Sequence, residues 1–266
     1  MWHGDAIHSC DFDPVSSELA TAGLCEDRDY VRFWDVRDKG TRREAPASEL
    51  GHFDLYYEYS LWGNVHVPIN MLRFSPNGLR LGLAGDDTKV EVLCRKPRAR
   101  DFGKSEMIRG WGPWKQLEGH LQPVFCMSWS GCSSFMATGS MDNTVIIWNI
   151  EKGCVLQRIE GIIRSFVNGV ALDPQGEYLA IQSNDRTLRL YQSGSSTAKT
   201  PPRFFPLTSF TRVKEYCLDE MQYVEDLENE GKEFPFLHGE QQFQHFYHRL
   251  EWSPDGAFFL TTGSFF

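Results

Sequence analysis

The segment from Gly119 to Asn149 constrains the fold of this chain more than any other. It opens with Gly119-His120 and closes with Trp148-Asn149, and Asp142 precedes the Trp by six residues. Between these ends, short runs of alternating apolar residues are separated by Ser-Gly and Met-Asp-Asn turn signals. Period-two alternation with tight turns is typical of short antiparallel strands. The segment therefore predicts one small antiparallel sheet.

The polar residues of this segment predict a buried hydrogen-bond chain. If His120 and Asp142 lie on adjacent turns, the imidazole bonds the carboxylate. A strand hydroxyl, from Thr138 or Ser140, and the Trp148 indole N–H then complete the chain. An unpaired buried polar group costs about 1 to 3 kcal/mol, so the chain stabilises the sheet only when every member is bonded. The candidate structural network is His120, Thr138, Asp142 and Trp148.

The pattern occurs five times, which predicts an all-β fold of the WD40 β-propeller class. The copies are expected at residues 3–36, 66–93, 120–148, 163–191 and 251–263. Leu93 and Tyr191 replace the closing Trp, and Ile163 replaces the opening His. The last copy lacks its Asp turn and its Trp strand, so we expect an incomplete propeller, about four and a half blades of seven. The alternative is a natural four-bladed ring.

The first copy can be interpreted in more than one way. Its opening residue is His3 or His8, and its turn acid is Asp27 or Asp29. Trp34-Asp35-Val36-Arg37 also fits the WDxR pattern by which many propellers dock a cullin-ring ligase adaptor. The same Trp-Asp is what the third strand of any blade ends with. A ubiquitin-ligase substrate receptor is therefore the alternative function from another class.

Composition favours a binding platform over an enzyme. The chain is 41% hydrophobic, which is enough to form a core. Its net charge of −9 is opposite in sign to that of proteins that bind phosphate backbones. No apolar run approaches the roughly 18 residues of a membrane span. The seven cysteines are scattered without ligand spacing, so we expect buried small hydrophobes in a reducing compartment. No catalytic motif is present, and we expect no metal, cofactor or small-molecule substrate.

Two inserts interrupt the repeats. The first, residues 95–110, begins with Arg95-Lys96-Pro97-Arg98-Ala99-Arg100, and is a solvated loop or a nuclear-import or nucleic-acid contact. The second spans residues 194–235 and ends acidic. Within it, helical spacing of apolar residues predicts a short amphipathic helix over Glu215–Glu233. Its outward acids either dock a basic ligand such as a histone or form a solvated face.

The residues resemble a family of propellers, the mid-size subunit of chromatin assembly factor 1. The matching stretches are Trp2-His3 with Ile7–Phe12, Trp114–His120 with Ser140–Trp148, Val167–Val170 with Asp185–Tyr191, Leu237-His238, Phe246–Leu250 and Ser253–Gly256. His248 stands where the family has an Arg. The HIR/HIRA propeller, which deposits histones independently of replication, has a similar sequence in the third and fourth copies.

The resemblance implies a nuclear protein of replication-coupled chromatin assembly. Its partners are then core histones and the large subunit of chromatin assembly factor 1. From the charge and the short apolar runs, we expect no sequence-specific nucleic-acid contact and no membrane contact. The acidic insert and the last matching stretch supply the candidate partner-binding residues, which are Glu225, Asp226, Glu228, Glu230, His238, Phe246 and Arg249.

Overall fold

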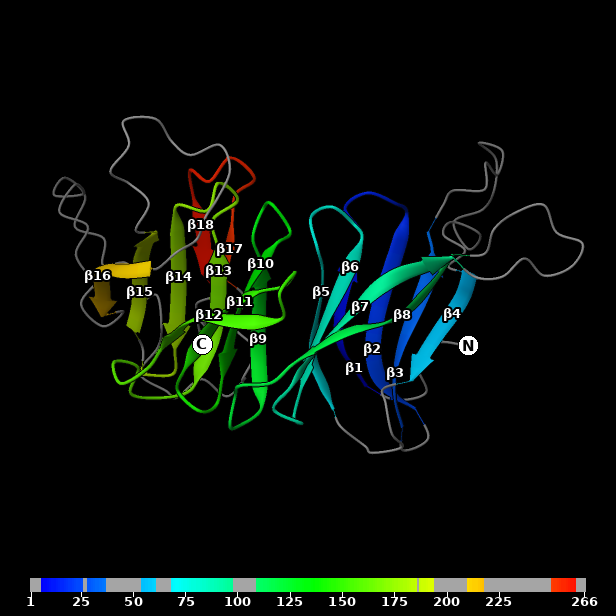
Figure 1. The fold of residues 1–266 in the computed structure, drawn as a ribbon, viewed down its shortest axis with the longest axis horizontal. Coiled ribbons are helices and arrows are strands. Elements are labelled where there is room, and N and C mark those ends of the chain that lie inside the picture. Colours follow the sequence, from blue (N-terminus) through cyan, green and yellow to red (C-terminus); the bar gives the residue numbers. More distant parts are fainter. Residues whose placement is uncertain are drawn as a thin grey trace, which may run out of the picture. The chain divides into compact units, whose positions relative to one another are not determined.

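The structure, a computed structural model, describes residues 6–25, 28–36, 54–60, 68–97, 109–185, 187–193, 210–217 and 250–261. Every regular element in these residues is a β-strand (Figure 1). The strands form four four-stranded sheets and one two-stranded sheet, and all pairs are antiparallel. Within this part of the chain no helix is long and apolar enough to cross a membrane.

Each sheet takes its strands in chain order and is one propeller blade, so the predicted fold class is confirmed. Blade one contains β1 Ile7–Phe12, β2 Glu18–Cys25, β3 Arg28–Asp35 and β4 Asp54–Ser60. Blade two contains β5 Ile69–Phe74, β6 Arg80–Gly85, β7 Val90–Pro97 and β8 Arg109–Leu117. Blade three contains β9 Val124–Trp129, β10 Phe135–Ser140, β11 Val145–Asn149 and β12 Cys154–Ile159. Blade four contains β13 Val167–Leu172, β14 Tyr178–Ser183, β15 Thr187–Ser193 and β16 Phe210–Cys217, and blade five contains β17 Leu250–Trp252 and β18 Phe259–Thr261.

The chain divides into two compact units, residues 1–118 and residues 119–266. In the first unit, β1 lies beside β5, and the facing sides of blades one and two form a continuous apolar core. The rings of Phe33 and Trp111 stack there with centroids 5.3 Å apart. The two blades also share a polar contact, because the backbone N–H of Leu72 donates to Ser9 Oγ at 3.1 Å. Apolar packing and a satisfied backbone donor together join these blades.

The second unit repeats this arrangement. Strands β9, β13 and β17 lie side by side. The backbone N–H of Leu172 donates to Ser128 Oγ at 3.0 Å, which is the counterpart of the Leu72 bond. Trp252 donates its indole N–H to the Ala171 carbonyl at 3.1 Å and stacks on Tyr178 with centroids 6.3 Å apart. Blade five is therefore anchored on blade four through β17.

The structure corrects the expected extent of both inserts. Strand β7 continues to Pro97 and β8 begins at Arg109, so the ends of the basic insert are sheet residues. Strand β16 lies inside the second insert, and Glu215 pairs with Arg189 of β15. The helix predicted from Glu215 is thus wrong at its start, because a fourth strand covers the edge that β15 would otherwise present. The rest of that prediction lies outside the described residues.

Burial is defined for five of the seven cysteines, and the prediction that they are buried is wrong for four of these five. Cys126 is buried, whereas Cys10, Cys132 and Cys154 are exposed and Cys94 is half-buried. All five are free thiols. Cys10 lies on β1, Cys132 in the turn after β9 and Cys154 at the start of β12. The presence of a cysteine in the sequence does not show whether its side chain lies on the buried or the exposed face of a strand.

Candidate functional site

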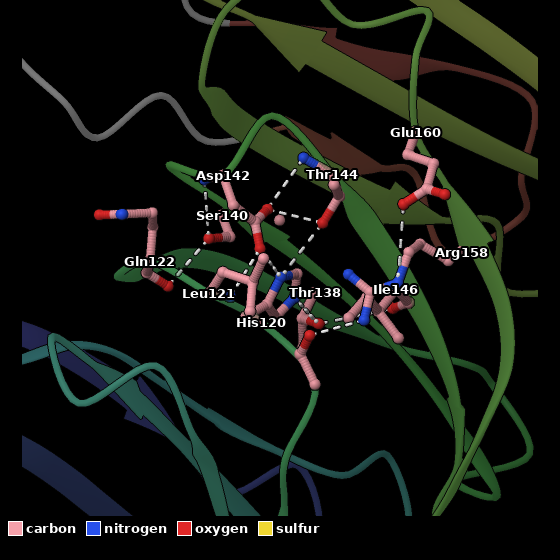
Figure 2. Close-up of polar contacts among 12 residues, drawn as sticks. His120, Leu121, Gln122, Thr138, Ser140, Asp142, Thr144, Ile146, Arg158 and Glu160 are labelled. Carbon is pink, nitrogen blue, oxygen red and sulfur yellow. Dashed lines mark hydrogen bonds and ion pairs between the residues drawn. The ribbon is translucent and has the colours of Figure 1, made fainter.

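The turn ends of blade three hold a chain of polar side chains (Figure 2). His120 Nδ1 lies 3.0 Å from Asp142 Oδ2, and His120 Nε2 lies 2.8 Å from Thr138 Oγ1. The indole N–H of Trp148 donates to the same Thr138 hydroxyl oxygen at 2.8 Å. The structure therefore brings all four candidate network residues together. Three of them, Thr138, Trp148 and His120, are buried, with 0%, 1% and 5% of their surfaces exposed.

The direction of each hydrogen bond follows from what each group can donate. An ionised carboxylate only accepts, so His120 Nδ1–H donates to Asp142. In the neutral imidazole Nε2 then accepts, so the Thr138 hydroxyl donates to it while accepting from Trp148. Thr144 adds a hydroxyl that donates to Asp142 Oδ1 at 2.6 Å. Each proton has an acceptor, which is the condition under which a buried network stabilises a fold.

The structure also decides between the two hydroxyls that the sequence allowed. Thr138 bonds His120 and Trp148, whereas the Ser140 hydroxyl donates to the carbonyls of Gln122 and Pro123 at 3.0 and 2.9 Å. Ser140 Oγ also accepts the backbone N–H of Asp142 at 3.1 Å. Ser140 therefore holds the turn in place, while Thr138 joins the imidazole to the indole.

The carboxyl group of Asp142 is ionised in this setting. Partial burial alone raises its pKa, but hydrogen bonds from His120, from Thr144 and from the Leu121 backbone N–H outweigh burial and hold the pKa well below its ordinary value. The Asp–His–hydroxyl order matches that of hydrolase triads, yet the Thr138 oxygen has no exposed surface and already receives an indole proton. The arrangement is suited to holding strands together and not to attacking a substrate.

In blade four the turn acid, Asp185, is bonded by a different kind of residue. Ile163 stands in the position of His120 and Ile181 in that of Thr138, so both the imidazole and the hydroxyl that it bonds are absent from blade four. Arg189, which is 2% exposed, instead donates to Asp185 Oδ2 at 2.9 Å and to Ser183 Oγ at 2.9 Å. The sequence reasoning missed Arg189. A cation between two leucines in a strand whose repeat lacks its histidine was the signal that pointed to it.

The turn acid has one further role that blades two, three and four share. One carboxylate oxygen accepts the backbone N–H two residues later, from Lys89 to Asp87 at 3.2 Å, from Thr144 to Asp142 at 3.0 Å and from Thr187 to Asp185 at 3.1 Å. This side-chain bond closes the tight turn that links the second and third strands. The spacing of the acid was thus a local signal, readable without knowledge of the fold.

Blade one keeps the indole half of the network. Trp34, which is 3% exposed, donates to Thr21 Oγ1 at 2.8 Å, so the Trp of the WDxR pattern is a buried structural residue. His8 lies exposed on β1, and Asp29 lies in β3 opposite Leu24, outside a turn. The remaining candidate residues of this copy, His3, Asp27 and Arg37, lie outside the described residues, as does the predicted opener of blade two, His66.

The first cation of the basic insert takes part in a buried ion cluster. Arg95 bonds the carboxylates of Asp13 and Glu18, donates from Nε to the Gly78 carbonyl at 2.6 Å, and lies 4.6 Å above the Trp111 ring. The predicted solvated loop is therefore wrong for Arg95. The cluster joins blade one to blade two, because the Asp13 side chain is fully buried and needs a cation.

The candidate partner-binding residues are not placed by the structure. Glu225, Asp226, Glu228, Glu230, His238, Phe246 and Arg249 all lie within residues 218–249, outside the described part of the chain. In the described part, no group of three or more His, Cys, Asp or Glu residues is arranged to hold a metal ion.

A model described as the CAF1B/HIR1 beta-propeller domain matches residues 2–265, which takes in all five blades. The chain belongs to this family. The match confirms the resemblance seen in the residues of the third and fourth blades.

Individual relatives agree with the family model. The chain is 31% identical to the chromatin assembly factor 1 subunit FAS2 homolog of Oryza sativa subsp. japonica, over 97% of the chain and 47% of that relative. It is 29% identical to the B subunit of chromatin assembly factor 1 from Mus musculus, over 98% of the chain and 42% of the relative. It is 26% identical to protein HIR1 of Coccidioides immitis, over 94% of the chain and 22% of that relative. The chain thus spans less than half the length of these relatives.

Proposed function

We propose that this chain is the propeller scaffold of a histone-chaperone complex that assembles nucleosomes during DNA replication. The observation that carries the proposal is the family match along residues 2–265. The relatives named as chromatin assembly factor 1 subunits are 29% and 31% identical and the HIR1 relative is 26% identical, which favours the replication-coupled factor. We place the protein in the nucleus with core histones and the large subunit of that factor as partners.

The physical properties of the chain suit this role. Hydrogen-bond networks in blades three and four bond the turn acids and strand polar groups, so we expect binding partners to use exposed faces. A net charge of −9 attracts a basic protein over distances up to the Debye length, beyond which salt screens the interaction. We therefore propose that histones associate with the acidic insert and that the large subunit contacts the blades. Charge would then control the association rate more than the final affinity.

The test uses the full-length protein with its acidic insert neutralised. The insert variant replaces Glu225, Asp226, Glu228 and Glu230 with Ser or Gln. A matched control removes four exposed acids of the described blades, Glu118, Glu151, Glu160 and Glu251. We expect slower association with core histones for the insert variant and not for the control. In the parent protein, histone binding should weaken as salt is added. Co-purification with the large subunit should be unchanged in both variants. Equal slowing in both variants would assign the effect to net charge and remove the insert from the binding surface.

A HIR-type deposition role is the second candidate, because the family model covers both kinds of protein. Affinity purification from replicating and non-replicating nuclei separates the two. Recovery of the large subunit of chromatin assembly factor 1, with localisation at replicating DNA, supports the first role. Recovery of histones without that subunit in both kinds of nuclei supports the second, and a cullin adaptor without histones would overturn both.

A further inference from the structure

The fourth strand of blade three, β12, begins with an exposed apolar stretch. Its first three residues, Cys154, Val155 and Leu156, are all exposed, and 41% of Val155 and 36% of Leu156 is accessible to solvent. Leu156 is the extra residue of a β-bulge, because Ile147 and Trp148 of β11 pair with the residues on either side of it. A bulge leaves its extra residue out of the ladder. The start of β12 is therefore apolar, exposed and incompletely paired with its own sheet.

Strand β12 is also an edge strand. The sheet has the order β12-β11-β10-β9, and in the part of the chain that the structure describes β12 pairs with β11 and with no other strand. The opposite edge of the sheet, β9, lies beside β13 of blade four. All four strands of blade three are described, so the exposed edge belongs to a finished sheet. One side of β12 thus presents backbone N–H and C=O groups that an added strand could bind.

The equivalent edge of blade two is protected. Pro113 of β8 occupies the ladder position of Val155, opposite the closing residue of the third strand. A proline has no N–H to offer to an added strand. The preceding residue, Gly112, is buried, and a Cβ there would meet the Lys96 side chain at 2.9 Å. A proline and a charged side chain therefore cover this part of the blade-two edge.

Charged residues mark the equivalent edges of blades one and four. In β16 the residue at the ladder position of Val155 is Arg212, and Lys214 follows two residues later. In β4 that position is Leu55, and Asp54 precedes it. Charges and prolines on edge strands are means by which proteins prevent edge-to-edge pairing. Of the four fourth strands that the structure describes, β12 is the one that carries neither at these four positions, residues 154–157.

We propose that β12 binds an extended segment of a partner protein, which pairs with it as a fifth strand of blade three. The segment carries β-branched apolar residues beside Val155 and Leu156, because such side chains pack well against apolar neighbours on an adjacent strand. Main-chain hydrogen bonds supply the affinity and the apolar contacts supply the specificity.

A flexible segment fits this edge better than a second copy of the chain does. The strand has six residues, which is short for an interface between two folded copies, because a stable interface needs about 1,000 Å². Two copies paired through β12 would also bring two bulged strands together, and a bulge bends and twists its strand. The proposal rests on the geometry of the blades and is independent of the function in chromatin assembly.

The probe is a fluorescently labelled peptide, Ser-Glu-Thr-Val-Ile-Val-Thr-Lys-Ser, which has no net charge in its side chains. We expect saturable binding to the full-length protein by fluorescence anisotropy, with slowed hydrogen exchange of β12 amides. Two N-methylated forms test the main-chain hydrogen bonds, one methylated at both valines and the other at the isoleucine. Neighbouring N–H groups of a strand point to opposite edges, so one form loses its bonds to β12 and should bind about tenfold more weakly, whereas the other should bind like the parent peptide.

A pair of protein variants tests the position of the site. Val155→Arg gives β12 the residue that Arg212 supplies in β16, and should weaken peptide binding about tenfold or more. The matched control is Leu121→Arg, which adds the same charge at a 78% exposed residue of blade three outside β12 and should leave binding unchanged.

The proposal is overturned by the absence of saturable binding, by equal affinity for the two methylated peptides, or by equal weakening in the two protein variants. Slowed exchange in β4 or β8 in place of β12 would also overturn it, as would self-association of the protein through β12 in the absence of peptide. The methylated peptides on the parent protein keep the test decisive if Val155→Arg fails to fold.

Discussion

Arg189 donates a 2.9 Å hydrogen bond to Asp185 and takes the place of the histidine that blade four lacks. The acid also accepts the Arg164 backbone N–H at 3.2 Å, just as Asp142 accepts the Leu121 backbone N–H at 2.9 Å in blade three. The acid therefore accepts the same backbone bond in both blades, whereas the side chain that donates to it differs, His120 in one and Arg189 in the other.

The Trp148→Ala substitution tests the blade-three network. We expect a loss of about 3 to 5 kcal/mol in the free energy of unfolding, because a large buried ring is removed and Thr138 loses its indole donor. Tyr191→Ala, in the blade without a histidine opener, should cost less. Denaturant unfolding of both variants measures the difference, and equal losses would contradict a special role for the network.

Asp185 predicts a pH dependence of stability. Burial alone raises its pKa, but hydrogen bonds from Arg189, Ser183, Thr187 and the Arg164 backbone lower the pKa to about 2 from its ordinary 3.8. Because the folded-state pKa is depressed, the stabilisation is complete above pH 4 and disappears as the pH falls towards 2. Unfolding measured across that interval should show a smaller decline for Asp185→Asn than for the parent. An identical decline would show that Asp185 does not contribute.

Two glycines separate the cost of a positive φ from the cost of a collision. Gly78 and Gly161 both have positive φ, but a Cβ on Gly78 meets Asp13 Oδ1 at 2.6 Å whereas one on Gly161 meets nothing within 4 Å. Each Ala substitution should cost about 1 kcal/mol for backbone conformation. Gly78→Ala should lose about 1 to 3 kcal/mol more, because the ion cluster holds Asp13 in place. Thermal or denaturant unfolding of the matched pair checks this, and equal losses would mean that Asp13 moves freely.

The Arg95–Asp13 pair predicts non-additive substitutions. Arg95→Met leaves the fully buried Asp13 carboxylate without its cation and should cost about 3 to 5 kcal/mol. Adding Asp13→Asn to that variant should restore part of the loss, because the unpaired charge is then gone. A double-mutant cycle by denaturant unfolding measures the coupling. Simple addition of the two single losses would show that the pair is not coupled.

Some of the structure was predictable because its causes are local. The turn acid of blade three, its histidine opener and its closing Trp148 lie within one repeat, and period-two alternation reports the strands between them. His120 and Asp142 therefore had to meet once the intervening strands formed a sheet. The fourth strands carry no such motif, and the helix predicted from Glu215 therefore begins where the structure has the last residues of β16.

Only the tertiary structure decided which polar groups share an acceptor or a charge. Thr138 and Ser140 are two residues apart on one strand, and the registry with neighbouring strands and the preceding loop gives Thr138 the imidazole and Ser140 the loop carbonyls. Arg95 belongs to a run of cations by sequence, yet it binds Asp13, 82 residues earlier, because the packing of blade two on blade one buries that carboxylate. Charge and spacing along the chain determine what a residue is able to bind, whereas burial between blades determines what it must bind.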